Sequence, residues 1–168
     1  VYSVQDDAQV MQALREAAAA QRLGSGGSKA FHQFRLTDRQ PESGITFRYR
    51  MTDDSGRREK AIHYDHGSAV AAADVDGDGL PDLFFGNQIG GNQLWRNLGG
   101  GRFTNITDQA GVAVAGRVSV SAAFADLDND GDSDLVVSTV RDGNVLFENT
   151  GGGTFRDVTA TAGWKTRS

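Results

Sequence analysis

The sequence contains no cysteine, only two prolines and no long apolar run. Without cysteine there is neither a disulfide framework nor a thiolate metal site, although many secreted bacterial proteins also lack this residue. No apolar run reaches the ~18 residues that a transmembrane helix needs, so we expect no membrane span. No basic stripe is present, and we therefore do not expect nucleic acid as a partner.

The composition that remains is rich in glycine and acidic. The 168 residues include 22 glycines, 38% are hydrophobic, and the net charge is −5. Nine of the aspartates fall in two short segments, so the acidity is local. Many glycines with few prolines indicate tight turns rather than disorder. The modest apolar content predicts a thin core that a bound metal helps to stabilise.

The first acidic segment, residues 74–82, has the sequence Asp-Val-Asp-Gly-Asp-Gly-Leu-Pro-Asp. Ca²⁺ takes six to eight oxygen ligands at about 2.3–2.6 Å, and glycines let alternate side chains converge. Two carboxylates roughly 4 Å apart repel by about 4 kcal/mol at an effective dielectric of 20 unless a cation lies between them. The segment predicts a calcium loop. The alternative, a solvated acidic turn, is weakened because the pattern occurs twice.

The second acidic segment, residues 126–134, starts 52 residues after the first. The same offset aligns the following residues without a gap, including Asn97 with Asn149 and the glycines 99–101 with 151–153. A fixed period of this length indicates a repeat architecture. In each repeat we expect four strands, at about 69–73, 83–87, 92–97 and 103–107 and at their counterparts 52 residues later.

Two other kinds of calcium loop do not fit these segments. An EF-hand needs a glutamate at position twelve of its loop, between two helices. That position holds Phe85 in one copy and Val137 in the other, each within an apolar run that predicts a strand. The glycine-rich nonapeptide pattern of β-helical calcium repeats is also absent. The cation is therefore expected in a loop between β-strands.

These motifs resemble the FG-GAP or VCBS-type repeat. The resemblance rests on Asp-x-Asp-x-Asp-Gly-x-x-Asp-Leu, then Leu-(Trp/Phe)-x-Asn, Gly-Gly-Gly-x-Phe and Ala-Gly, and it covers roughly residues 43–164. Such repeats form the calcium-binding blades of integrin-α-like β-propellers. The sequence motifs of this chain are most similar to those of the secreted, cartilage-acidic-protein-like branch. The chain departs from the family in number, because propellers use several blades and two occur here.

The resemblance implies two Ca²⁺ sites, each made of aspartate side chains and one backbone carbonyl. In the first repeat the implied ligands are Asp74, Asp76, Asp78 and Asp82, with the carbonyl of Leu80. In the second repeat they are Asp126, Asp128, Asp130 and Asp134, with the carbonyl of Asp132.

The fold class that follows is mainly β: two four-stranded antiparallel propeller-blade-like repeats preceded by an N-terminal α-helix and a β-hairpin. Residues 1–28 are assigned to a helix, at about 3–22, and a Gly/Ser linker. Residues 29–68 form the lead-in, in which a strand at 45–51 pairs with one at 60–64. The first calcium-binding repeat spans 69–116 and the second spans 117–168. Trp95 and Phe147 are expected to fill the space between the blades.

Sequence motifs for catalysis are absent, and we do not expect an enzyme. No Gly-x-Ser-x-Gly elbow, phosphate-binding loop or dinucleotide fingerprint is present. Paired carboxylates could indicate a glycosidase, but both clusters have calcium-loop spacing. His63, Asp65 and His66 also invite a metal or catalytic interpretation, yet adjacent residues of a strand point to opposite faces.

Two function classes remain open. The first is a calcium-binding structural or adhesive protein, secreted or at the cell surface, that assembles with its own copies head-to-tail into an extracellular filament. The argument is that two blades cannot close a ring, so their outer faces invite association. The chain also stops at Ser168, just past the second repeat. The alternative is an excerpt of a larger propeller that binds a protein or glycan ligand.

Overall fold

The computed structural model describes residues 12, 15–17, 19–20, 37–51, 68–140 and 142–163. The chain divides into two compact units, Val1–Thr37 and Asp38–Ser168, and each is described by itself. In the first unit the described residues between 12 and 20 are helical, and Gln12 donates a hydrogen bond to Glu16 at 3.0 Å. They agree with the predicted helix; its remaining residues and the linker lie outside the described part of the chain.

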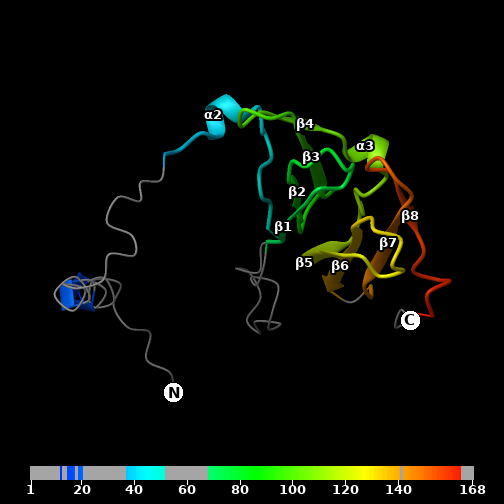
Figure 1. The fold of residues 1–168 in the computed structure, drawn as a ribbon. Coiled ribbons are helices and arrows are strands. Elements are labelled where there is room, and N and C mark those ends of the chain that lie inside the picture. Colours follow the sequence, from blue (N-terminus) through cyan, green and yellow to red (C-terminus); the bar gives the residue numbers. More distant parts are fainter. Residues whose placement is uncertain are drawn as a thin grey trace, which may run out of the picture. The chain divides into compact units, whose positions relative to one another are not determined.

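The second unit contains two four-stranded antiparallel sheets, each with its strands in sequence order (Figure 1). The first blade consists of β1 (Val70–Ala73), β2 (Asp82–Phe85), β3 (Gln93–Asn97) and β4 (Phe103–Asn105). The second blade consists of β5 (Val118–Ala125), β6 (Asp134–Val140), β7 (Val145–Asn149) and β8 (Phe155–Asp157). The predicted architecture of two blade-like antiparallel repeats is confirmed.

A side-chain turn ends the fourth strand of each blade earlier than predicted. The side chain of Asn105 accepts hydrogen bonds from the backbone N–H and the hydroxyl of Thr107, at 2.9 and 2.6 Å. Thr107 begins the short helix α3 (Thr107–Ala110), and its hydroxyl oxygen accepts a bond from the N–H of Leu94 at 2.9 Å. Asp157 and Thr159 repeat these contacts in the second blade. The turn replaces strand pairing because Asn and Asp side chains bond the backbone two residues on.

The main hydrophobic core contains residues of both blades. Phe124 of β5 lies edge-on to Phe84 of β2, with ring centroids 6.4 Å apart, and 6.5 Å from Phe155 of β8. A backbone hydrogen bond from Ser119 to the carbonyl of Asn87, at 3.1 Å, also joins the blades. The buried core residues are Val75, Phe84, Leu94, Ala110, Val112, Leu135, Val137, Val145, Phe147 and Phe155.

The two aromatic residues expected between the blades differ in position. Phe147 belongs to this core, as predicted. Its counterpart Trp95 is buried but is not a member of the core. Its neighbour Leu94 belongs to the core, and successive strand residues face opposite sides of a sheet. Trp95 therefore points to the other face of the first blade, where its indole N–H bonds Gln93 at 3.0 Å.

The segment before the first blade starts with the short helix α2 (Gln40–Ser43) and continues as extended chain. Phe47 stacks on Phe85 with ring centroids 4.8 Å apart, and the N–H of Arg50 bonds the side chain of Asn87 at 2.7 Å. Residues 45–51 have no strand assignment. Their predicted partner, residues 60–64, lies outside the described residues. The lead-in is held by the loop after β2, a contact that periodicity does not reveal.

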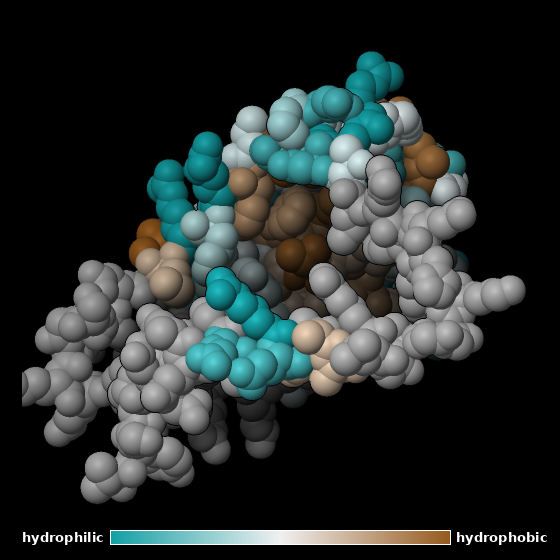
Figure 2. All heavy atoms as spheres, turned by 90° about the vertical axis from the view of Figure 1, so that its left-hand side faces the viewer, coloured by the Kyte–Doolittle hydropathy of each residue, from teal (hydrophilic) through white to brown (hydrophobic). Residues whose placement is uncertain are grey.

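The surface of the described residues is mixed in character. In the view of Figure 2, apolar residues gather at the centre of a hollowed face, with hydrophilic residues above and below them. Among the described residues, no helix is both long enough and apolar enough to cross a bilayer.

Candidate metal-binding loops

Both acidic segments occupy the connection between the first and second strands of a blade (Figure 1). The loop at 74–82, called here the first loop, joins β1 to β2, and Ala73 pairs with Asp82 at its base. The loop at 126–134, the second loop, joins β5 to β6, and Ala125 pairs with Asp134. The sheet thus fixes both ends of each loop.

Three carboxylates converge in the first loop. Asp74, Asp76 and Asp82 each place an oxygen so that all three atoms lie within 4.8 Å of one another. Oxygens that share one Ca²⁺ at about 2.3–2.6 Å lie no more than about 5 Å apart. The spacing and the hard oxygen donors therefore fit a calcium ion.

Backbone N–H groups hold the Asp74 carboxylate in place. Gly77 and Asp78 donate to its Oδ1 at 2.8 and 3.1 Å, and Gly79 donates to its Oδ2 at 2.7 Å. These bonds, that from Gly79 above all, lower the pKa of Asp74 below its ordinary value. Asp74 is thus a preorganised, charged acceptor at the start of the loop.

Asp82 closes the loop from its buried end. It is fully buried and accepts hydrogen bonds from the N–H groups of Val75, at 3.0 Å, and Asn97, at 2.7 Å. Burial raises the pKa of Asp82, and the charges of Asp76 and Asp78 act in the same direction, against those two hydrogen bonds. A cation would offset that burial and repulsion.

The second loop repeats this network at equivalent positions. Asp134 is 2% exposed and accepts from the N–H groups of Leu127 and Asn149, both at 2.9 Å. Gly131 donates to Asp126 at 3.1 Å. The oxygens that converge within 4.8 Å belong to Asp126, Asp128 and Asp130.

Some predicted ligands lie outside these clusters of three. Asp78 is not part of the first cluster, and Asp134 is not part of the second. Asp78 instead accepts the N–H of Leu80 at 2.8 Å, and Asp130 accepts that of Asp132 at 2.9 Å. These bonds fix the backbone next to the two carbonyls that the family pattern implies as ligands. The full ligand sets remain predictions.

The two loops also share an unusual backbone conformation. Gly77 and Gly79 have φ of 77° and 82°, and the equivalent residues Asn129 and Gly131 have 64° and 97°. Asparagine tolerates this left-handed region better than other non-glycine residues. The sequence pattern therefore keeps the same curl with two different residues.

We expect Asn129→Gly to preserve thermal stability and Asn129→Ala to lower the free energy of unfolding by about 1 kcal/mol, because alanine is strained at positive φ. Gly77→Ala is the matched variant in the first loop. Because a Cβ added there meets no atom within 4 Å, the stability that this variant loses measures the backbone strain alone. Chemical denaturation measures all three; an Asn129→Ala protein as stable as the parent would contradict the assignment.

An arginine that the sequence analysis did not single out reaches into the first loop. Arg96 of β3 places Nη2 2.5 Å from Oδ2 of Asp76 and 3.7 Å from Oδ2 of Asp78. The Asp76 side chain is only 5% exposed, yet its Oδ2 has no hydrogen-bond partner. The Arg96 guanidinium is the close cation at this oxygen, so a metal ion in the first loop would compete with Arg96 for it.

The second blade carries the opposite charge at the equivalent position, Glu148. Arg156 of β8 donates to both oxygens of Glu148, at 2.7 and 2.8 Å. Burial raises the pKa of Asp128, and the charges of Asp130, Asp134 and Glu148 add to that shift. An alignment of the two repeats shows that the charge at position 96 is reversed at position 148. It does not show that these side chains lie close to the loops.

Comparison with known families agrees with the repeat. The family model described as FG-GAP-like repeat matches residues 74–137 and again 126–167. A comparison with curated proteins gives no significant match. The two matches begin at the first aspartate of each loop and together cover more than half of the sequence. The chain therefore belongs to the FG-GAP-like repeat family.

Proposed function

We propose that the chain is a secreted calcium-binding structural module with one Ca²⁺ in each loop. The observation that carries the proposal is the repeated convergence of three carboxylate oxygens within 4.8 Å, in which equivalent backbone N–H groups, of Gly79 and Gly131, bond the first aspartate of each loop. The ion's role is to neutralise mutually repelling carboxylates, of which Asp82 and Asp134 are buried. Ligation by protein oxygens leaves little open coordination for catalysis, so we propose no enzymatic activity.

Calcium titration calorimetry should give two ions per chain. Asp76→Asn and Asp128→Asn should each reduce the stoichiometry to one, because each removes a charge from one cluster. Asp108→Asn is the matched control, since Asp108 is an exposed acid of α3 outside both loops. A stoichiometry of two in either loop variant, or of zero in the parent protein, would contradict the proposal.

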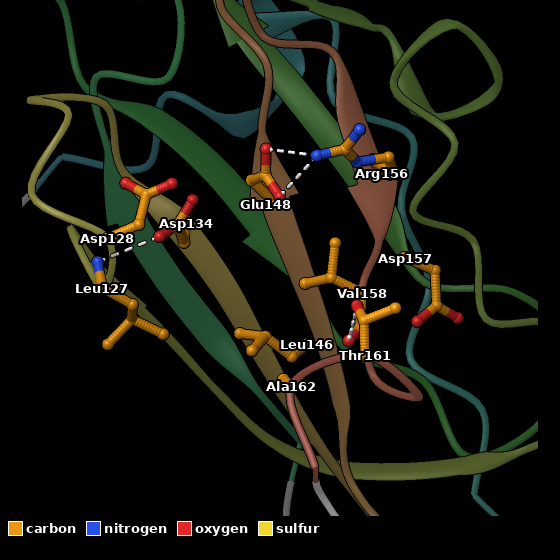
Figure 3. Close-up of a pocket in the computed structure, with 10 residues that line it drawn as sticks. All are labelled: Leu127, Asp128, Asp134, Leu146, Glu148, Arg156, Asp157, Val158, Thr161 and Ala162. Atoms are coloured by element: carbon orange, nitrogen blue, oxygen red, sulfur yellow. Dashed lines mark hydrogen bonds and ion pairs between the residues drawn. The ribbon is translucent and has the colours of Figure 1, made fainter.

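The second blade has an apolar face that none of the described residues covers, and this face supports assembly. An open depression of about 550 Å³ has an apolar part formed by Leu127, Leu146, Val158 and Ala162 (Figure 3). The rest of its lining is polar and comprises Asp128, Asp134, Glu148, Arg156, Asp157 and Thr161. The equivalent residues of the first blade, Val75, Leu94, Ile106 and Ala110, pack in the core or against it. Val75 is 2% exposed there, whereas Leu127 is 49% exposed. In the first blade these apolar residues are covered by the second blade. In the second blade no described residue covers their counterparts.

We assign a second copy of the chain to this face. The lead-in and the loop after β2, which are joined through Arg50, expose Tyr49, Met51 and Ile89 at 38%, 54% and 44%. Docking of that surface on the depression joins two different patches, and such heterologous contacts give open filaments when the rotation does not close. The N-terminal segment, residues 1–28, is proposed to contribute to the contact.

Leu127→Asp should convert assemblies into monomers in millimolar calcium, because it places a charge in the apolar depression. Leu98→Asp is the matched control, since Leu98 is 50% exposed but does not line the depression. Analytical ultracentrifugation over a concentration series provides the measurement. Deleting residues 1–28 should likewise stop growth at monomers or small oligomers. Long fibres from either altered protein would contradict head-to-tail assembly.

The second candidate function is part of a larger propeller that binds a protein or glycan ligand. The same depression favours it, because a further blade of the same polypeptide would cover Leu127 as the second blade covers Val75. The two candidates differ in self-association: a parent protein that stays monomeric at all concentrations in millimolar calcium supports the larger propeller and contradicts the filament.

A further inference from the structure

The two loops differ in the charge that the third strand of each blade presents to them. Position 96 on β3 and position 148 on β7 are equivalent in the repeat. Position 96 holds an arginine whose Nη2 lies 2.5 Å from Asp76 and 3.7 Å from Asp78. Position 148 holds a glutamate. The sign of the charge beside the candidate ligands is therefore reversed between the blades.

The fourth strands complete the difference. Arg156 of β8 bonds Glu148 through one nitrogen, with both carboxylate oxygens within 2.8 Å. The first-blade residue at the position of Arg156 is Thr104, which pairs with Arg96 across the sheet as Arg156 pairs with Glu148. In the first blade, Arg96 thus contacts the loop aspartates. In the second blade, Arg156 instead pairs with Glu148.

We propose that Arg96 is a built-in counter-ion of the first loop that weakens its affinity for calcium and stabilises its ion-free form. The inference rests on the proposed calcium function, and it makes the pairs 96/104 and 148/156 the residues that set the affinity of each loop. Arg96 takes no part in holding the ion.

The physical reason is competition for the same oxygen. Oδ2 of Asp76 is buried and has no hydrogen bond, so it either faces the guanidinium or binds the ion. Calcium must displace Arg96 or tolerate a positive charge a few ångströms away. The Coulomb repulsion between a divalent ion and a guanidinium is twice that of two unit charges at the same distance. The Arg96 side chain is 43% exposed, so solvent screens much of this repulsion, and we expect Arg96 to weaken calcium binding roughly tenfold in Kd.

The test isolates each loop in the full chain. Asp128→Asn leaves the first loop as the only candidate site. In that protein, Arg96→Glu with Thr104→Arg transfers the second blade's arrangement, and calorimetry should show calcium binding tightened about tenfold. Asp76→Asn leaves the second loop, where Glu148→Arg with Arg156→Thr should weaken binding by a similar factor. Because the two exchanges predict opposite changes, a general loss of folding cannot produce both.

A second readout separates the counter-ion from an ordinary packing role. Arg96→Gln should lower the melting temperature in chelator, where the first loop loses its internal cation, and should leave it unchanged or raised in saturating calcium. Arg102→Gln is the matched control, because Arg102 is an exposed arginine of the same blade and should be neutral in both conditions. Equal destabilisation by Arg96→Gln with and without calcium would overturn the proposal.

The outcomes distinguish this inference from the function on which it rests. If the parent protein binds two calcium ions but neither exchange changes Kd by more than about twofold, the counter-ion role is wrong and calcium binding stands. If the parent protein binds no calcium, the proposed function fails and this inference fails with it.

Discussion

Removing calcium should lower the melting temperature of the protein by on the order of 10–20 °C. An ion that binds only the folded state adds about 2.7 kcal/mol at one hundred times Kd, or about 5 kcal/mol for two sites. For a domain of this size each kcal/mol moves the melting temperature by about 2–4 °C. The cost arises because Asp82 and Asp134 are buried near other carboxylates, those of Asp76 and Asp78 in the first loop and of Asp128 in the second.

Thermal melting in excess EGTA and in millimolar calcium provides the comparison. The double variant Asp76→Asn, Asp128→Asn is the control: it should melt at the same temperature in both buffers, because one charge is missing from each cluster. Addition of Mg²⁺ should restore little, since that ion demands near-octahedral geometry and gives up its waters reluctantly. Identical melting of the parent protein in EGTA and calcium would refute a structural role for the ion.

The repeat is the part of the fold that the sequence predicts well. A single offset of 52 residues places Asp74 on Asp126 and Asn97 on Asn149, and the structure has equivalent strands and loops at these positions. The prediction succeeds because blade strands, loop aspartates and turn glycines each have local sequence requirements. The side chains of Asn105 and Asp157 accept backbone N–H groups in place of the hydrogen bonds that pair two strands. At these positions the predicted strands ended two residues too late.

Contacts between distant segments were not predictable in this way. Residues 45–51 alternate like a strand, but their backbone bonds the loop after β2 through Asn87, Gln88 and Ile89. Trp95 and Phe147 are equivalent in the repeat, yet only Phe147 belongs to the core with residues of both blades. The role of the Arg96 charge was not predictable, because it depends on the short distance between Arg96 and Asp76 in the folded chain. Each case depends on what lies beside a blade, and a repeat pattern contains no information about that.

The candidate metal loops are joined to the packing between blades through Asn149. Its N–H bonds Asp134, the buried acid of the second loop, at 2.9 Å. Its side-chain amide donates to the carbonyl of Val75 in the first loop at 2.9 Å and to that of Ser133 at 3.3 Å. Its side-chain oxygen accepts the N–H of Gly151 at 3.0 Å. One residue thus connects both loops and both blades.

Asn149→Ala should therefore be among the most destabilising single substitutions, lowering the free energy of unfolding by about 3–5 kcal/mol. Each buried polar partner left unsatisfied costs about 1–3 kcal/mol, and Asn149 is only 1% exposed. Asn97→Ala is the matched control, because Asn97 makes the equivalent bonds to Pro81 and Gly99. Among the described contacts Asn97 has no hydrogen bond to another blade, and Asn97 is only partly buried. We expect about 1–2 kcal/mol for it.

Urea denaturation of both variants in saturating calcium measures the difference, which is attributed to the bond across the blades. Asn149→Asp refines the test, since it keeps the acceptor for Gly151 and loses both donated bonds. It should be at least as damaging as alanine, because it adds a buried negative charge facing two carbonyl oxygens. Equal losses in Asn149→Ala and Asn97→Ala would show that each asparagine acts only within its own blade, and that the bond to Val75 contributes nothing to holding the two blades together.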